Sequence, residues 1–356
     1  MSFSREEGSR LADRLRDRIG REGPISFRDF MASALYDPRD GYYSRGARIG
    51  ERGDFVTSPY VSPSFAATLA RRFATEVAAI PGEVDFVEVG AGEGRLLEDF
   101  DAALARDSPE AASRARYTAI ESSEACRRSL AARRLSRELR VLSSADELAP
   151  RSVRGWIFSN ELFDAVPVSR VVGTGDGLRE LRVAADGDGF RWVEAPAGEE
   201  LAKRLERFGT VLAPGQEAEV ALEAAELYAR LAKALAIGSL VTFDYGHRAR
   251  VLYHSVARPR GTLAVHFGGR RQADPLFRPG DVDLTAHVNW DELIAAGEEE
   301  GLETVGLFRQ GRFLVESGIF DFTPTDAERW RAYRLVDPEG MGDELSVLVQ
   351  TRAARV

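Results

Sequence analysis

The stretch DFVEVGAGEGRLLEDF, residues 85–100, decides the fold that this chain is expected to adopt. It begins with apolar and β-branched residues that predict a buried strand, and it ends with the apolar spacing of a helix. Gly90, Gly92 and Gly94 stand between the two. Glycines at a strand-to-helix turn allow the backbone to approach a ligand closely, as in folds that bind nucleotides. The stretch therefore predicts a site for a nucleotide-like molecule at the end of a core strand.

The spacing of these glycines separates three kinds of ligand. A dinucleotide fold has a further glycine where Arg95 stands, and the arginine side chain would crowd the contact between helix and strand. The loop that binds nucleoside triphosphates requires Gly-Lys-Ser/Thr, which does not follow here. The order that remains, Glu-x-Gly-x-Gly-x-Gly from Glu88 to Gly94, is typical of class I S-adenosylmethionine-dependent methyltransferases. We therefore expect S-adenosyl-L-methionine as the cofactor and give an NAD-dependent oxidoreductase little weight.

Acidic residues at strand ends match the polar groups of that cofactor. Glu88, at the end of the first strand, is placed for the amino group, and Glu121, at the end of the second, for both ribose hydroxyls. A charge-assisted hydrogen bond of this kind contributes about 1.5–3 kcal/mol. Asp146, after a third strand, can approach the adenine amino group, although its segment SADEL also reads as an ordinary helix N-cap.

Short apolar strands alternate with longer helices from residue 84 onward. The strands VDFVEV, RYTAIE, LRVLSS, RGWIFSN and GSLVTFDYG are predicted in that order, and TLAVHF, ETVGLF and LSVLVQT supply the remaining ones. Uninterrupted apolar strands that alternate with helices indicate a mainly parallel sheet with helices on both faces. The predicted fold class is α/β, with a Rossmann-like class I methyltransferase core.

Changes of composition divide the chain into three predicted segments. Residues 1–80 supply N-terminal helices and a long aromatic loop that would cover the cleft, with Ser26 as a helix N-cap. Residues 168–236 carry hairpin turns at TGDG and ADGDG and then helices, which predicts a small antiparallel β insertion. Residues 81–167 and 237–356 form the predicted cofactor-binding core.

The overall composition excludes several classes of partner. A net charge of −9 and a pI near 5.3 oppose a general nucleic-acid binder and leave room for a basic protein substrate. No apolar run approaches the roughly 20 residues that span a bilayer, so no membrane insertion is expected. The single cysteine, Cys126, suits a reducing compartment and is expected to be a buried structural thiol. The N-terminal stretch lacks the apolar core of a secretory signal, so we expect a cytoplasmic protein.

The segment NELFDAVP, residues 160–167, follows another strand and would reach the same edge of the sheet. Asn160, Glu161 and Asp164 gather there as candidate catalytic residues, and one helical turn would place the two acids on one face. Two acids near a sulfonium methyl group favour a cationic or N–H acceptor, such as an arginine guanidinium. Carboxylates could hold that group and orient one nitrogen toward the methyl group. The alternative is that the segment only caps a helix and packs its apolar residues.

Two further residues are candidates for the acceptor side. Asp244, in VTFDYGH, ends another strand at the same rim, and His287, in DVDLTAHVNW, stands beside apolar residues. A lone histidine in such surroundings is more often structural than functional. The remaining histidines show no metal-ligand spacing and have no cysteine partners, so no metal is expected.

Several motifs follow one another in order along nearly the whole chain. They are FMASALYDPRDGYY, GDFVTSP, EVGAGEG, SNELFDAVPV, FDYG, RGTL, DLTAHV and DPEGMGDELSVLVQ. With these motifs the chain resembles the MidA-like family of class I methyltransferases from about residue 24 to the carboxyl end. The resemblance implies a core that binds S-adenosylmethionine, and a role for Gly53, Asp54 and Thr57 of GDFVTSP at the cofactor or substrate cleft. The glycine loop differs, because Ala91 and Glu93 stand where the family commonly has proline and arginine.

The resemblance also implies a class of substrate. The family includes a mitochondrial complex I assembly factor that dimethylates an arginine of a complex I subunit, so a protein substrate, such as a respiratory-complex subunit, is implied. The residues themselves leave three functions open. These are a protein N-methyltransferase, a small-molecule methyltransferase favoured by the aromatic loop at 36–55, and a non-catalytic assembly or binding protein that retains the fold.

Overall fold

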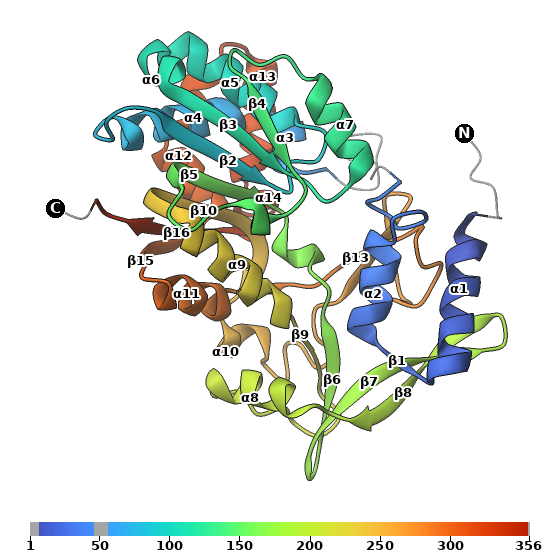
Figure 1. The fold of residues 1–356 in the computed structure, drawn as a ribbon. Coiled ribbons are helices and arrows are strands. Elements are labelled where there is room, and N and C mark those ends of the chain that lie inside the picture. The colour runs from blue at the N-terminus through green and yellow to red at the C-terminus, as the bar shows by residue number, and fades with distance from the viewer. Residues whose placement is uncertain (1–6, 46–55, 355–356) are drawn as a thin grey trace.

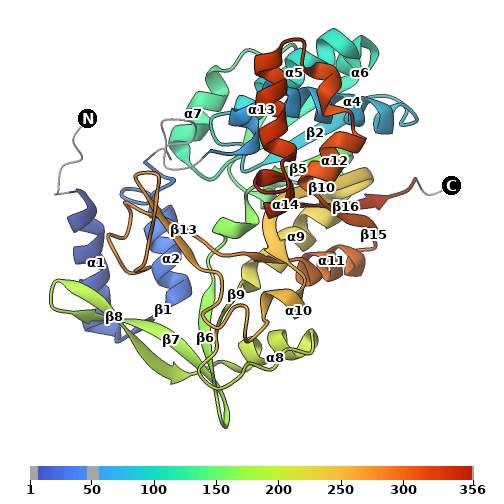
Figure 2. The same cartoon turned by 180° about the vertical axis from the view of Figure 1, so that it is seen from behind.

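The computed structural model of the chain describes residues 7–45 and 56–354, and it places them in two lobes (Figures 1 and 2). In Figure 1 the upper lobe holds the larger sheet, and the lower lobe holds the long β-hairpins and the two N-terminal helices. Gly53 and Asp54, which the family resemblance assigns to the cleft, lie outside the described residues.

The larger sheet is mixed and mainly parallel. Its strands are β2 (Val84–Val89), β3 (Ala115–Ile120), β4 (Leu139–Leu142), β5 (Val153–Asn160), β10 (Leu235–His247), β14 (Val288–Asn289), β15 (Glu303–Arg309) and β16 (Leu345–Arg352). They run in the order β15-β16-β10-β5-β2-β3-β4, and β14 pairs with β10 outside this path. All pairs from β10 to β4 are parallel, whereas β16 is antiparallel to β10 and β15 is antiparallel to β16. The predicted α/β, Rossmann-like core is confirmed.

Helices cover both faces of this sheet (Figure 1). They are α3 (Ser58–Val61), α4 (Pro63–Val77), α5 (Arg95–Asp107), α6 (Pro109–Arg114), α7 (Glu124–Ala132), α9 (Leu222–Ala234), α11 (Trp290–Glu299), α12 (Gln310–Glu316), α13 (Asp326–Val336) and α14 (Met341–Glu344). Alternate residues of each strand face opposite sides. Phe86 and Val241 therefore pack with α4 and α5, whereas Val87 and Leu240 pack with α9 and α11.

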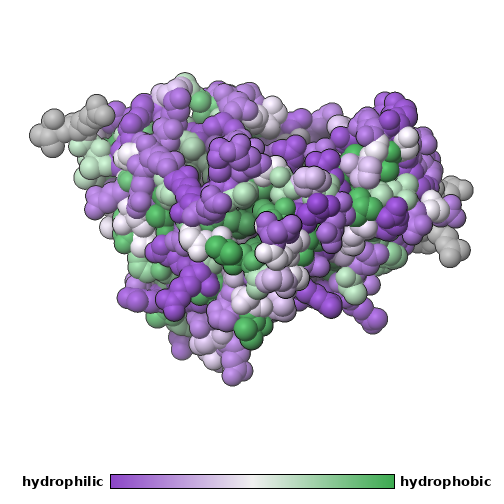
Figure 3. Space-filling model, turned by 90° about the horizontal axis from the view of Figure 1, so that it is seen from below, coloured by the Kyte–Doolittle hydropathy of each residue, from purple (hydrophilic) through white to green (hydrophobic). Residues whose placement is uncertain are grey.

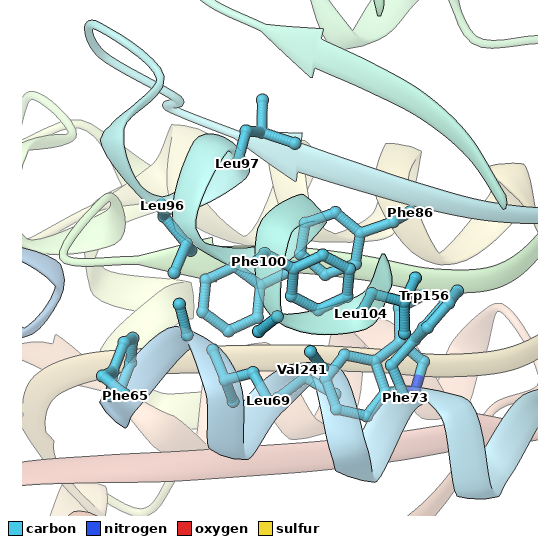
Figure 4. Packing of buried hydrophobic residues seen from close by; sticks show 14 of the residues in the cluster. Phe65, Leu69, Phe73, Phe86, Leu96, Leu97, Phe100, Leu104, Trp156 and Val241 are labelled. Carbon is cyan, nitrogen blue, oxygen red and sulfur yellow. The ribbon is translucent and has the colours of Figure 1, made fainter. Parts of the chain in front are cut away.

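Aromatic rings fill the core between the sheet and helices α4 and α5 (Figure 4). Phe73 and Phe100 come from the helices, Phe86 and Trp156 come from the strands, and all four are fully buried. The rings of Phe86 and Phe100 stack with their centroids 3.9 Å apart. Each buried aromatic side chain of this kind stabilises the fold by about 1.5–3 kcal/mol. This layer fixes the end of β2, from which the glycine turn starts.

The lower lobe is antiparallel. Its elements are α1 (Glu7–Glu22), β1 (Ile25–Ser26), α2 (Phe27–Tyr36), β6 (Ser169–Thr174), β7 (Gly177–Asp186), β8 (Gly189–Pro196), α8 (Glu199–Arg207), β9 (Glu217–Val220), α10 (Ala249–Leu252), β11 (Ala264–Phe267), β12 (Arg270–Gln272) and β13 (Asp283–Thr285). One sheet runs β1-β7-β6-β9 with β8 paired to β7, and a smaller sheet runs β12-β11-β13. The hairpin turns predicted at TGDG and ADGDG are confirmed. The predicted strand TLAVHF forms β11, which joins the smaller sheet and not the larger one.

The N-terminal helices and the predicted insertion share one hydrophobic core. Leu11 of α1 and Phe30 of α2 belong to the same buried cluster as Val183 of β7. Ser26 caps α2 as predicted, because its Oγ accepts the Asp29 N–H at 3.0 Å. Helix α9, at the end of the predicted insertion, packs with α11 and the larger sheet. The segment boundaries at residues 168 and 236 stay a prediction.

One face of the molecule is mostly polar. The face shown in Figure 3 is largely hydrophilic, and its hydrophobic side chains lie in small groups. None of the described helices is both long enough and apolar enough to cross a membrane. Large hydrophobic side chains that are exposed include Trp330 and Tyr333 of α13.

Candidate functional site

The turn after β2 has the backbone conformation that glycine allows. Gly90, Gly92 and Gly94 have φ angles of 72°, 53° and 81°, a region that residues with side chains rarely adopt. A Cβ atom built on Gly92 would meet nothing within 4 Å, because this residue faces an open cleft. A Cβ on Gly94 would meet Leu130 Cδ2 at 2.6 Å. Gly94 therefore allows α7 to pack closely and is not among the described residues that line the cleft.

The cleft has a volume of about 1010 Å³ and lies at the carboxyl ends of the parallel strands. The structure brings seven of the predicted site residues to its wall: Thr57, Glu88, Gly90, Gly92, Glu121, Asn160 and Glu161. Ligand clefts in proteins usually have volumes of about 300–1,000 Å³. This one is large enough for a nucleoside-sized cofactor and for part of a second substrate.

Glu88 is a buried carboxylate with an unsatisfied oxygen. It is 5% exposed, and its Oε2 atom has no hydrogen-bond partner among the described residues. Burial, and then the negative charge of Glu121, raise the pKa of Glu88 well above its usual range. A cationic group bound beside Glu88 would favour the ionised carboxylate and would therefore lower this pKa. The ammonium group of S-adenosylmethionine fits this requirement.

Glu121 is held in place by two backbone amides. Its Oε2 accepts the Gly92 N–H at 2.8 Å, and its Oε1 accepts the Ser123 N–H at 2.8 Å. The first bond ties the carboxylate of β3 to the glycine turn of β2. A carboxylate oxygen can accept more than one hydrogen bond, so each oxygen can still accept one from a ribose hydroxyl. The residues present therefore fit S-adenosylmethionine.

Asp146 lies beside the cleft but not on its wall. Its side chain is 70% exposed and pairs with Arg230 at 3.3 Å. The neighbouring Ser144 and Ala145 line the cleft, as does Arg230. Ser144 caps the short helix of Asp146, which is the alternative that the sequence left open. This arrangement does not favour the predicted contact between Asp146 and adenine.

Asn160 and Glu161 form the wall at the end of β5. The Asn160 amide donates to Glu161 Oε1 at 2.9 Å, and the Ser58 N–H donates to the same oxygen at 3.3 Å. The Asn160 Oδ1 atom is buried and has no partner among the described residues. Burial raises the pKa of Glu161 to about 8. Glu161 also has a φ of 51°, which is unusual for a residue with a side chain.

The carboxyl group of Asp244 holds the turn that follows Glu161 through hydrogen bonds. The residue is fully buried, and its Oδ2 accepts the N–H groups of Leu162 and Phe163 at 3.0 and 2.7 Å. On the other side of the turn, the Glu161 N–H donates to the Phe243 carbonyl at 2.8 Å. Asp244 is not on the cleft wall, so the structure does not bring it to the place where an acceptor could bind.

Two other acceptor-side candidates also lie away from the wall. Asp164 is buried, and burial together with Asp244 raises the pKa of its carboxyl group well above the usual range. The ring of His287 lies 5.3 Å from that of His247 and 6.4 Å from that of Tyr245. Burial lowers the pKa of His287 to about 4, so the ring is neutral near pH 7. The structure does not bring either residue to the cleft.

Tyr36, Tyr43 and Cys126 are among the cleft-lining residues that sequence reasoning did not assign to the site. The rings of Tyr36 and Tyr43 stack with centroids 5.5 Å apart, and both line the cleft. The Tyr36 hydroxyl donates to the Ala165 carbonyl at 3.0 Å, and the Tyr43 hydroxyl donates to Asp283 at 2.8 Å. The aromatic content of their loop was the available signal. Cys126, expected to be buried and structural, is only half-buried and also lines the cleft.

Metal binding finds no support in the described part of the chain. No group of three or more histidine, cysteine, aspartate or glutamate side chains there is arranged to hold a metal ion. The expectation of no metal stays a prediction.

Residues 68–308 match a protein family described as "Putative S-adenosyl-L-methionine-dependent methyltransferase". Among curated proteins, the chain is similar to the mitochondrial protein arginine methyltransferase NDUFAF7 of Mus musculus. The two are 28% identical over 342 residues, which cover 85% of this chain and 72% of that protein. The Homo sapiens protein of the same name is 25% identical over the same shares.

Solved structures agree with this match. A crystal structure of a protein from Burkholderia thailandensis bound to S-adenosyl-homocysteine has a TM-score of 0.88 at 31% identity, covering 99% of this chain and 94% of that one. A second crystal structure from the same organism has a TM-score of 0.85 at 30% identity, over the same shares. S-adenosyl-homocysteine is S-adenosylmethionine without its transferable methyl group.

Proposed function

The chain belongs to the MidA-like family of S-adenosyl-L-methionine-dependent methyltransferases, and from this membership we propose that it methylates a protein on an arginine guanidinium nitrogen. The observation that carries the proposal is the pair of acceptors at the end of β5. Glu161 and Asn160 both line the cleft, and the buried Oδ1 atom of Asn160 has no hydrogen-bond partner among the described residues. Among the described residues, no cationic side chain forms an ion pair with Glu161. The guanidinium group of a substrate would supply that cation.

The acceptor geometry suits a planar group with several N–H donors. A guanidinium presents five N–H donors in a rigid fork that matches a carboxylate, and it stays protonated at ordinary pH. Glu161 would accept two of these N–H groups, and Asn160 Oδ1 would accept a third. Such contacts localise the positive charge and leave one nitrogen free to approach the reacting carbon, which is mainly a positioning effect. S-adenosylmethionine, when bound, supplies a methyl group activated by the adjacent sulfonium.

Tyr36 and Tyr43 would complete the acceptor site. A cation close to the face of an aromatic ring is attracted by the ring, and the attraction contributes about 0.5–2 kcal/mol. The two stacked rings line the same cleft as Glu161. They would also exclude water from the reacting atoms.

The names of relatives support the choice of acceptor. The similar proteins of Mus musculus and Homo sapiens are both named protein arginine methyltransferases. Their identities of 28% and 25% support a shared type of acceptor without fixing the individual substrate. A respiratory-complex subunit, which the family resemblance implies, is the first substrate to test.

A labelling experiment tests the proposal. The full-length protein is incubated with methyl-labelled S-adenosylmethionine and a cell lysate, and mass spectrometry then locates the label. We expect the label on an arginine side chain of a protein and expect it to be absent when Glu161→Gln replaces the wild type. Label only in the protein-free fraction, or only on residues other than arginine, would overturn the proposed acceptor.

A small-molecule acceptor is the second candidate. The observation in its favour is the stacked pair Tyr36 and Tyr43, since a flat aromatic or cationic metabolite could lie against these rings. The same experiment separates the two candidates, because a metabolite acceptor would carry the label after protein has been removed from the lysate.

A further inference from the structure

Helix α13 presents an exposed face that combines aromatic and basic residues. The face, called here the α13 face, consists of Arg329, Trp330, Arg331, Tyr333 and Arg334, all of which are exposed. With 3.6 residues per turn, these positions cover about half of the helix circumference, with Trp330 in the middle. The opposite side of the helix, with Ala332 and Leu335, is buried against the core.

The aromatic residues of the α13 face are unusually open to solvent. Trp330 is 71% exposed and Tyr333 is 45% exposed, whereas Trp156 and Trp290 are at most 1% exposed. The two rings contact each other edge to face, with centroids 5.8 Å apart. Exposed groups of large apolar side chains usually mark an interaction surface. Tryptophan, tyrosine and arginine are also the residues that contribute most binding energy at protein interfaces.

The charge of the α13 face is opposite to that of the whole protein. The chain has a net charge of −9, but the α13 face carries three arginines, and the acids Asp326 in the first turn and Asp337 at the C-cap, which lie on the same side of the helix, offset only part of that charge. Glu328 is occupied in the capping box with Thr325. Because charges more than about 8 Å apart are largely screened at physiological salt, the local arginines govern what binds here. An acidic partner is the complementary one.

The position of the α13 face connects it to the cleft. Helix α13 packs against α3, and Pro59 and Tyr60 of α3 line the cleft wall. Figure 2 shows α13 at the front of the upper lobe, on the outside of that lobe. A polypeptide bound along α13 would therefore lie next to an element of the cleft wall.

We propose that the α13 face is a docking surface for an acidic segment of the protein substrate, next to the residue that is methylated. This inference rests on the proposed function, since it assumes that the acceptor is a protein. Docking on α13 would add binding energy from parts of the substrate that do not react. Few contacts between the cleft and the acceptor side chain would then be required.

The first experiment measures docking without catalysis. The anisotropy of a fluorescein-labelled poly-L-glutamate peptide is followed while full-length protein is added at physiological ionic strength. We expect binding by the wild type and at least about tenfold weaker binding by Arg331→Glu and by Trp330→Ala. Lys203→Glu, an exposed site on α8 in the lower lobe, changes the charge by the same amount and should bind like the wild type. Failure of the wild type to bind, or equal binding by the α13 variants, would overturn the proposal.

The second experiment separates this proposal from the proposed function. The same variants are used in the lysate labelling, with S-adenosyl-homocysteine affinity as the check that the cleft is intact. We expect reduced protein labelling by Arg331→Glu with unchanged affinity for S-adenosyl-homocysteine. Normal labelling by that variant would refute the docking role while leaving the proposed function in place. If the wild type labels no protein but binds the peptide through α13, the proposed function fails, and the α13 face is a site for acidic peptides without the role in substrate docking.

A second copy of this chain is the other occupant to consider. Sedimentation velocity at increasing protein concentration tests it directly. A dimer that disappears in Trp330→Ala would assign the α13 face to self-association and would overturn the docking proposal. A monomer at all concentrations agrees with the proposal.

Discussion

Glu161 is the residue on which the chemistry of acceptor binding depends. We predict that Glu161→Gln reduces methyl transfer by about a hundred- to thousandfold, because it removes the charge that would hold the acceptor in the transition state. The affinity for S-adenosyl-homocysteine should change little, since Glu88 and Glu121 are intact. Turnover with labelled S-adenosylmethionine and calorimetric titration measure the two effects.

A matched control is available for that variant. Glu292 is also a buried glutamate, and burial raises the pKa of its carboxyl group to about 7. It does not line the cleft. Glu292→Gln should keep full turnover, and a loss as large as that of Glu161→Gln would mean that both changes act through folding.

The pH dependence of transfer should follow the ionisation of Glu161. Burial raises the pKa of Glu161 to about 8, so the carboxyl group carries a proton in most free enzyme molecules at neutral pH. An arginine acceptor stays cationic and requires the ionised carboxylate. We therefore predict that kcat/KM rises with pH and levels off above about 8. An unchanged rise in Glu161→Gln would assign the ionisation to another group.

Asp244 should act through Glu161 and not through the acceptor. Its negative charge contributes to the raised pKa of Glu161, and its carboxylate accepts the N–H groups that follow Glu161 in the chain. We predict that Asp244→Asn lowers kcat and moves the midpoint of the pH profile to a lower pH, with unchanged affinity for S-adenosyl-homocysteine. A loss of stability with the pH midpoint unmoved would reduce Asp244 to a structural role.

The site residues that could be predicted from the sequence are those at the ends of predicted strands. Glu88 and Glu121 follow directly from two strand ends, and both lie on the cleft wall. Asp244 could not be distinguished from a contact residue, because only the three-dimensional turn shows its carboxylate pointing at backbone amides. Tyr36 reaches the cleft from the other lobe, and the aromatic content of its segment indicated a cleft-covering role without assigning this residue to the site.

The glycine turn between β2 and α5 is the element that shapes the cofactor side of the cleft. We predict that Gly92→Val reduces the affinity for S-adenosyl-homocysteine by at least about a hundredfold while the fold is largely kept. The new side chain would occupy open space in the cleft, where a Cβ atom meets nothing within 4 Å. The positive φ itself would cost about 1–2 kcal/mol of stability. Titration calorimetry and a thermal melt measure the two effects separately.

The β7–β8 hairpin supplies a control for backbone strain. Gly187 has a φ of 54°, nearly equal to the 53° of Gly92, and a Cβ there also meets nothing within 4 Å. Gly187→Val should lose a similar amount of stability and keep the affinity for the cofactor product. Equal losses of affinity in both variants would show that strain, and not filling of the cleft, is responsible.

At the scale of elements, the sequence predicted most of the larger sheet. The strand VDFVEV forms β2 with the predicted bounds, because its residues are buried on both sides and the glycine turn ends it. The strand TLAVHF was predicted equally well as a strand, but its partners were not. It pairs with β12 and β13, and pairing partners distant in sequence depend on packing that a single strand does not reveal.

At the scale of the whole molecule, the cleft depends on both lobes. The upper lobe supplies the glycine turn, Glu88, Glu121 and Glu161, while α2 and the segment after it supply Tyr36 and Tyr43. These segments are joined by the shared core of the N-terminal helices and the hairpins.

Because the cleft exists only in the folded chain, bound cofactor should stabilise that chain by mass action, by about 2.7 kcal/mol at a concentration one hundred times its Kd.

We infer that a fixed carboxylate at the end of β3, that of Glu121, binds the cofactor beside the glycine turn. The most direct measurement is calorimetric titration of S-adenosyl-homocysteine into the wild type, Glu121→Gln and Glu219→Gln. Glu219 is a buried glutamate that accepts the Thr262 N–H at 2.7 Å away from the cleft wall. We predict that Glu121→Gln weakens binding by roughly ten- to a hundredfold, the loss of about one charge-assisted hydrogen bond, and that Glu219→Gln binds like the wild type. Wild-type affinity in Glu121→Gln would show that this carboxylate does not hold the cofactor, and no binding by the wild type would show that the cleft is not a cofactor site.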